Sequence, residues 1–292
     1  EDDNSIRTSR YPSNRRILIP EYLTPYLNGE EGLTDTNWLD EIFRTAPISS
    51  YNLSASGGSE KTKYFISGSY FDQKGIIIGS DYKRMSARFN IESKLNERVA
   101  FGINISPTYA VTSKVVENWT DSPLQQAIIS YPFFAPYNAD GSYNISGQII
   151  ANTPSDASLA ENPVAIANEI TNRDNEFRLY GNTYFELEVL SDLKFKTLLG
   201  GDYTSYTNTY FRPSFIGRYR DEAPSVTRGS EASSINENWL VETTLNYDTY
   251  FGDHNLQLLA GYSFQKEKTS LTTTEGSDFP NDLITNVEGA NT

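Results

Sequence analysis

Few side chains of this 292-residue chain have the types and spacing that catalysis requires. The chain has no cysteine and one histidine, His254, which the sequence GDHN places in a turn. This composition excludes disulfides and thiolate metal sites and removes most imidazole chemistry. The carboxylate pairs Glu186 with Glu188 and Glu30 with Glu31 have no partnered nucleophile or base. We therefore predict that the protein is not an enzyme and binds no cofactor.

Oxygen-bearing side chains in DGSYN (140–144) have a spacing that could hold calcium. A calcium loop would also need a later glutamate, which this segment lacks. Asp-Gly is a common turn sequence. The segment therefore predicts a simple turn and no metal site.

Aromatic residues in the longest irregular segment are the best candidates for ligand contact. A flat ring offers contact area to sugar faces or apolar peptide groups at low entropic cost. The candidates are Trp119, Tyr131, Phe133, Phe134, Tyr137 and Tyr143. The alternative interpretation is that these rings pack the segment against itself or against neighbouring parts of the protein.

The elements that must position these residues are four pairs of alternating segments, each joined by a short connection. In 82–92, Met85 and Phe89 point to one face and Arg84 and Arg88 to the other, because strand side chains alternate. The four predicted hairpins pair 48–57 with 62–72, 82–92 with 99–111, 176–190 with 193–206, and 236–248 with 254–266. In 62–72 the sequence does not decide which set of alternating residues forms the apolar face, because both sets contain tyrosines or phenylalanines.

The charged side chains of these strands share the face opposite the apolar one. The predicted lumen-facing residues are Arg84, Arg88, Glu186, Glu188, Lys194 and Lys196. They could hold another part of the protein inside the barrel or line a substrate path. Alternatively, they are solvated or mutually paired charges of a wet interior, which are ordinary in barrels.

The composition is compatible with a membrane protein that crosses by strands. Hydrophobic residues make up 37% of the chain, the net charge is −14, and the mean hydropathy is −0.52. A barrel strand shows only half of its residues to lipid, so average hydropathy stays low. No apolar run approaches the roughly 18 residues of a spanning helix, and the acidic balance argues against nucleic acid. The 20 tyrosines and 15 phenylalanines suit aromatic belts at membrane interfaces.

These observations predict an all-β fold, about eight antiparallel strands of a transmembrane β-barrel in the cell outer membrane. Residues 1–47 are expected to form an irregular segment that leads into the barrel, and 48–292 its wall. Short turns are expected on the periplasmic side, and the long loops 113–175, 207–234 and 267–292 outside the cell, because unpaired backbone is excluded from hydrocarbon. The first residues show no export signal, so we expect an interior piece of a longer protein.

Three short helices are predicted outside the strands. One covers part of 36–46, where Trp38 and Ile42 share a face. A second is capped by Ser122, with Pro123 at its first position. The third runs through 162–170.

Several stretches resemble one transporter family in order and spacing. They are NWLDEIFRTA (37–46), YNLSASGGSEKTKYFISGSYFDQKGII (51–77), SDYKRMSARFNIESKLN (80–96) and LLAGYSFQ (258–265). They resemble the early part of the barrel in SusC/RagA-type TonB-dependent transporters of Bacteroidetes.

The resemblance implies a roughly 22-stranded barrel with a plugged lumen, of which this chain is a part. It implies an importer of oligosaccharides or peptides that works with a SusD-like lipoprotein, with outer-membrane lipid around the wall. Energy coupling to TonB would use an amino-terminal region that these residues do not include.

A soluble or secreted β-sandwich carbohydrate-binding module is the alternative interpretation. Its strands would be shorter, typically about five or six residues, and a second sheet would cover its apolar face. The two interpretations therefore differ in what contacts Met85, Phe89 and their neighbours.

Overall fold

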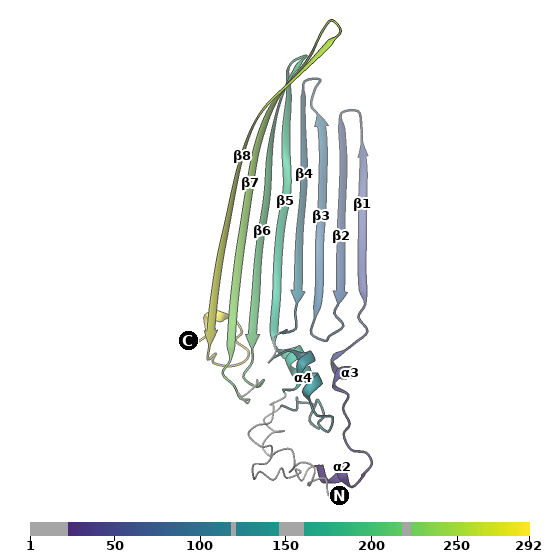
Figure 1. Ribbon diagram of the computed structural model, residues 1–292, viewed down its shortest axis with the longest axis vertical. Helices are drawn as coiled ribbons and strands as arrows, with labels where there is room; N and C mark the ends of the chain where they lie inside the picture. The colour runs from purple at the N-terminus through teal and green to yellow at the C-terminus, as the bar shows by residue number, and fades with distance from the viewer. Residues whose placement is uncertain (1–22, 118–120, 146–160, 218–222) are drawn as a thin grey trace, which may run out of the picture.

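The computed structural model describes residues 23–117, 121–145, 161–217 and 223–292. Within them, eight strands form one antiparallel sheet in which each strand pairs with its neighbours in sequence (Figure 1). The strands are β1 (Ile48–Gly58), β2 (Thr62–Lys74), β3 (Asp81–Lys94), β4 (Val99–Ser113), β5 (Thr171–Leu190), β6 (Leu193–Arg212), β7 (Arg228–Phe251) and β8 (His254–Ser277). The four predicted hairpins are all present, and the sheet is the all-β architecture that the alternation predicts.

The strands at the carboxyl-terminal half extend well beyond their predicted ends. The expected loops 113–175, 207–234 and 267–292 shorten because β5 begins at Thr171, β6 ends at Arg212, β7 begins at Arg228 and β8 ends at Ser277. These extensions are mostly polar on both faces, so they carry no regular apolar period. Their backbone pairing nevertheless continues without interruption from β6 to β8.

The register decides which face the ambiguous strand β2 presents. Tyr70 pairs with Met85 and Ile66 with Phe89, so both β2 side chains share the apolar face. Phe65 and Phe71 therefore lie on the polar face. A single-strand pattern could not decide between the two sets, because both contain aromatic residues.

The helices gather at the end of the sheet where the long connections lie (Figure 1). They are α2 (Thr24–Leu27), α3 (Trp38–Ile42), α4 (Pro123–Ile129), α6 (Pro163–Glu169) and the 3-10 turn η2 (Val287–Gly289). The predicted capping is present: the Ser122 side chain accepts a hydrogen bond from the Gln125 amide. Asn162 caps α6 in the same way, accepting from Val164 and Ala165.

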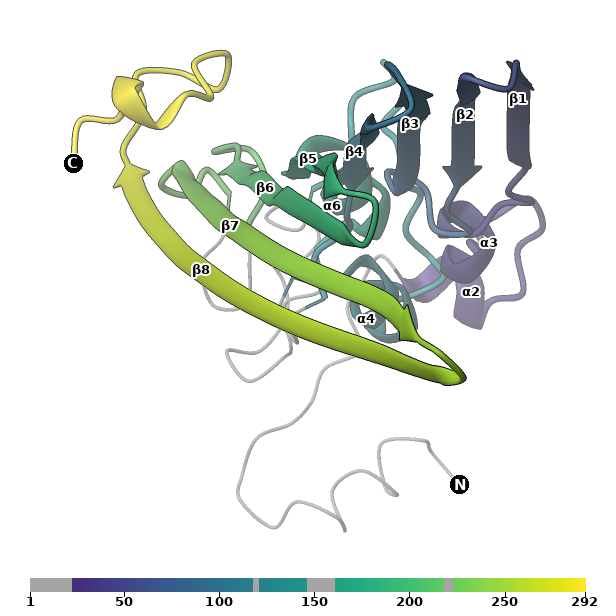
Figure 2. The same cartoon turned by 90° about the horizontal axis from the view of Figure 1, so that it is seen from above.

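The buried core of the described chain lies beside the sheet end and not on the strands. We call α3, α4, α6 and the chain packed on them the cap. Its buried apolar residues are Trp38, Ile42, Ala127 and Val164 in one cluster, and Val116, Ala165, Ile166, Ile170 and Ile216 in the other. Seen from above, the sheet is curved and these helices lie on its inner side (Figure 2).

Among the residues that the structure describes, no second layer covers the apolar face of the sheet. Leu53 keeps 81% and Trp239 keeps 59% of its surface exposed. A β-sandwich would bury these side chains beneath a second sheet. The sandwich alternative is therefore not favoured, and the single curved layer has the form of a barrel wall.

Candidate functional site

The apolar face ends in a row of large side chains, mostly aromatic, on the side of the long loops. The row Tyr51, Tyr70, Met85, Tyr109 and Phe177 lies level across β1 to β5. On the later strands the border shifts two positions toward the short turns from each strand to the next. The border residues there are Tyr203 on β6, Trp239 on β7 and Phe264 on β8. Beyond them the same face becomes mostly polar, with Phe211 and Ile235 as exceptions. A slanted aromatic border of this kind is typical of tilted strands that cross a membrane interface.

The six charged residues predicted on the opposite face all lie there, because the observed register keeps their parity. Glu186 pairs with Lys196, and Glu188 pairs with Lys194, across β5 and β6. The Lys196 ammonium lies 4.4 Å from the centre of the Tyr184 ring. Arg84 lies over the ring of Phe71 at 5.8 Å, and Arg88 is opposite Ser67 on β2. Opposite charges therefore face one another on β5 and β6, while β3 carries the two arginines.

A second set of polar contacts on this face was not singled out from the sequence. Arg178 donates two hydrogen bonds to Asp202, at 2.9 and 2.6 Å. Asn104 donates to Asn182 at 3.0 Å. The alternation assigned each residue to the correct face, but a one-strand pattern does not say which residues are opposite each other.

A further polar cluster lies nearer the long-loop end of the same face. Asp174 forms an ion pair with Lys114 at 2.8 Å. It also accepts hydrogen bonds from Tyr206 at 2.8 Å and from Asn208 at 2.7 Å. These contacts make the polar face a hydrogen-bonded surface, which is suited to water or a polar ligand and not to hydrocarbon.

The aromatic candidates of the long loop separate into two groups. Phe134 and Tyr143 pack against the buried clusters of the cap, which fits the self-packing interpretation. Tyr131 and Tyr137 remain 48% and 45% exposed. Phe133 lies between the groups, stacked on Tyr131 at 5.1 Å and edge-on to Phe134 at 4.8 Å. Trp119 lies outside the described residues.

The Tyr137–Tyr143 hairpin joins the exposed and buried groups. The two rings stack at 5.4 Å, and the Tyr143 hydroxyl donates to Glu169 on α6 at 3.0 Å. Partial burial raises the pKa of Tyr143; the hydrogen bond from Asn168 opposes that shift and the Glu169 carboxylate adds to it. The exposed ring of Tyr137 is thus held in place by a partner anchored in the cap.

The DGSYN segment forms the Asp-Gly turn that its sequence predicts. Gly141 has a φ of +84°, and Asp140 accepts hydrogen bonds from the Ser142 amide and hydroxyl. The hydroxyl bond is the main reason that the pKa of Asp140 is lowered. Within the described ranges, no group of three or more histidine, aspartate or glutamate side chains is placed to hold a metal ion.

The cap is held together by buried polar groups as well as by its apolar clusters. Arg212, at the end of β6, donates to Asp121 at 2.7 Å and to the carbonyls of Ile216 and Gly217. The Gln126 side chain accepts a hydrogen bond from the Glu161 amide at 2.8 Å. Because these partners are distant in sequence, the network ties the long loops to the end of the sheet.

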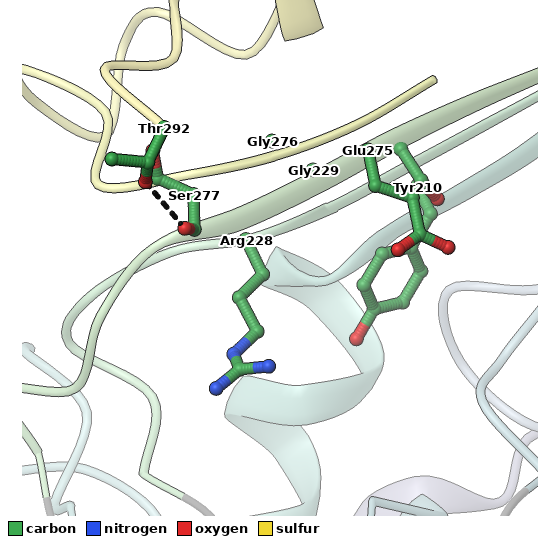
Figure 3. A pocket seen from close by; sticks show the side chains of 8 residues that line it. Tyr210, Arg228, Gly229, Glu275, Gly276, Ser277 and Thr292 are labelled. Carbon is green, nitrogen blue, oxygen red and sulfur yellow. Dashed lines mark hydrogen bonds between the residues drawn. The ribbon is translucent and has the colours of Figure 1, made fainter. Parts of the chain in front are cut away.

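A pocket of about 430 Å³ opens on the polar face where β6, β7 and β8 reach the long loops. Tyr210, Arg228, Ser230 and Glu275 line it. Figure 3 shows Tyr210 and Arg228 pointing to the same side of the strands, toward a helix of the cap. A cation, a carboxylate and a phenol in one recess are suited to a polar ligand with several hydrogen-bonding groups.

The described helices are all too short or too polar to span a bilayer.

Curated relatives are similar to most of this chain. TonB-dependent receptor P3 of Formosa agariphila is 34% identical over 248 residues, which is 82% of this chain and 23% of that protein. TonB-dependent receptor P26 of the same organism is 26% identical over 88% of this chain and 25% of its own length. TonB-dependent receptor SusC of Bacteroides thetaiotaomicron is 27% identical over 63% of this chain and 20% of its own length. The chain thus spans about a quarter of the length of these relatives.

Solved structures share the fold. The RagAB peptide transporter superposes with a TM-score of 0.70 at 23% identity, over 88% of this chain and 28% of that chain. The RagAB peptide importer in its "open-open" state gives 0.73 at 21% identity, over 99% of this chain and 34% of that chain. No family model matches the chain.

Proposed function

Because this chain is a barrel segment of a TonB-dependent receptor of the SusC/RagA type, we propose that the complete protein is an outer-membrane importer of oligosaccharides or peptides. One observation carries the proposal: a single sheet exposes a continuous apolar face bordered by aromatic residues. Only a membrane or another apolar layer could cover such a face, since an exposed apolar surface of this size is unfavourable in water.

The short turns would face the periplasm, and the cap and the long loops the cell exterior, as in other barrels of this kind. The mostly polar extensions of β6 to β8 support this orientation, because strand ends with polar residues on both faces are more stable in water than in hydrocarbon. The outer loops would then be the segments between and after the observed strands, residues 114–170, 213–227 and 278–292.

The polar face would line the lumen and contact the plug. The ion pair of Arg178 with Asp202 suits that role, because two opposite charges beside water satisfy one another and still offer hydrogen bonds. Both open edges of the described sheet, on β1 and β8, would pair with further strands of the complete barrel.

Ligand contact would involve the exposed rings Tyr131 and Tyr137, with Phe133 supporting Tyr131. A SusD-like lipoprotein would close over the same end of the barrel. TonB would supply energy through the amino-terminal part of the complete protein. In this assignment the protein moves its ligand and does not transform it chemically.

Uptake by the complete protein tests the proposal. Labelled oligosaccharides and peptides are supplied to cells that express it, with and without TonB, and internalised label is counted. We expect TonB-dependent uptake of one ligand class, reduced by the double substitution Tyr131→Ala and Tyr137→Ala. Tyr250→Ala is the control, because this tyrosine is 72% exposed but lies at the short-turn end. Uptake that is independent of TonB would contradict the importer assignment, and equal effects of the two substitution sets would contradict the ligand role.

A further inference from the structure

The apolar face has a groove of about 420 Å³ where β5, β6 and β7 run side by side. Its floor is formed at Gly181 and Gly201, which pair across the two strands. Leu179, Leu199, Tyr203 and Trp239 stand around it. Two facing glycines remove the side chains that would fill this space, so the backbone is exposed at the bottom of the groove.

The two glycines differ in whether a side chain can replace their hydrogen. A Cβ at Gly201 would meet the Trp239 ring at 3.5 Å, an ordinary contact. A Cβ at Gly181 would meet the Asn104 carbonyl oxygen at 2.4 Å, a clash with backbone. Glycine is therefore required sterically at Gly181 but not at Gly201, although both together create the groove.

Charged side chains lie beside the groove, on β7 and β8 at its Trp239 side. Trp239 pairs with Lys266 on β8, and Glu237 pairs with Lys268 one step toward the long loops. These side chains share the face of the groove, because strand parity alternates. Two lysines and one glutamate leave a local excess of positive charge, at the level where the apolar face becomes polar.

We propose that the groove holds one acyl chain of a phosphate-bearing membrane lipid, whose headgroup is bound by Lys266 and Lys268. This proposal rests on the proposed membrane location of the barrel. Continuity with the membrane-facing surface argues for a hydrocarbon occupant, and the lysines argue for an anionic headgroup. Hydrocarbon surrounds the whole face, so selectivity comes from van der Waals contact in the concave groove and from the charge.

Native mass spectrometry of the complete protein in detergent tests the site. Phosphatidylglycerol and phosphatidylcholine with identical chains are titrated separately. We expect preferential binding of phosphatidylglycerol, and loss of both lipids in Gly201→Leu, which fills the groove. The double substitution Lys266→Gln and Lys268→Gln should weaken only phosphatidylglycerol, by about fivefold per lysine removed. Glu237→Gln should strengthen it.

Ala87→Leu is the matched control, because it adds the same side chain on the same face, at a position that does not line the groove. Equal lipid binding by Gly201→Leu and Ala87→Leu, or unchanged phosphatidylglycerol binding after removal of both lysines, would overturn the inference. Membrane assembly is measured in parallel by heat-modifiable mobility on gels. A wild-type protein that does not assemble in membranes would overturn the proposed function as well, whereas normal assembly without the lipid effects would overturn only the site.

Discussion

The wall, formed by β1 to β8, and the cap differ in how far they bury their apolar side chains. The wall is the larger part, yet most of its large apolar residues stay exposed on one face. The cap has only short helices, yet it contains nearly all of the fully buried apolar residues of the described chain. The cap is therefore stabilised as a water-soluble protein is, by its own core. The stability of the wall depends on what surrounds it, which in the proposed assignment is lipid on one face and water or a plug on the other.

The buried ion pair gives the largest expected effect, and it should be confined to the cap. Arg212 is 2% exposed, and Arg212→Met removes the charge partner of Asp121. Removing one member of a buried pair costs about 3–5 kcal/mol. We expect faster hydrogen exchange in α4 and α6 of the complete protein, with unchanged exchange in β2 and β3. Equal loosening of the wall would show that the two regions are one cooperative unit.

A charge on the outer face should affect the wall instead. Phe89→Arg places a cation in the apolar band, which costs about 2–4 kcal/mol at the bilayer midplane. We expect reduced amounts of heat-modifiable protein in the outer membrane.

The adjacent residue Asn90 provides the control, because it lies on the polar face of the same strand. Asn90→Arg should assemble normally. If both variants assembled equally well, the assignment of the two faces would be wrong.

Removal of the side chain that caps the N-terminus of α6 should have an intermediate effect. The Asn162 side chain accepts from two amides of α6 and donates to the carbonyls of Pro136 and Asn144. Asn162→Ala should destabilise the cap by about 1–2 kcal/mol. Limited proteolysis should then cut the long loop between β4 and β5 faster, while the heat-modifiable mobility of the barrel stays unchanged. A cleavage rate equal to that of the wild type would show that the Asn162 side chain does not limit the stability of this loop.

The exposed ion pair of the wall gives the smallest effect. Arg178 and Asp202 form two short hydrogen bonds, but the arginine side chain is 51% exposed. Solvent screening limits such a pair to about 0.2–1 kcal/mol. A double-mutant cycle with Arg178→Met and Asp202→Asn, read by thermal unfolding of the barrel, should give a coupling in this range. A coupling as large as that expected for Arg212 would mean that the lumen face is much drier than its exposure indicates.

Much of the wall could be predicted from the chain itself. The alternation in 82–92 and 99–111 placed Met85 and Phe89 opposite Arg84 and Arg88, and the register agrees. The polar ends of β7 and β8 could not be found in this way, because a strand with water on both sides has no apolar period. The same limit explains why the expected outer loops were too long.

Only part of the candidate site could be predicted from the sequence. Aromatic composition drew attention to the loop that contains Tyr131 and Tyr143, but it could not separate an exposed ring from one packed in the cap. The pairing of Arg178 with Asp202 depends on the register of two strands. The groove depends on Gly181 meeting Gly201 beside Trp239.

The sequence by itself determined the two-faced strands, the four hairpins and the resemblance to a transporter wall. Each of these is local: the solvent on either side of a strand imposes a period of two on its own residues. Only the tertiary structure decided the face of β2, the core of the cap, the partners of Arg212 and Arg178, and the groove. All of them join residues that are far apart in the chain, and such contacts are chosen by packing and pairing across the whole sheet, which no single segment encodes.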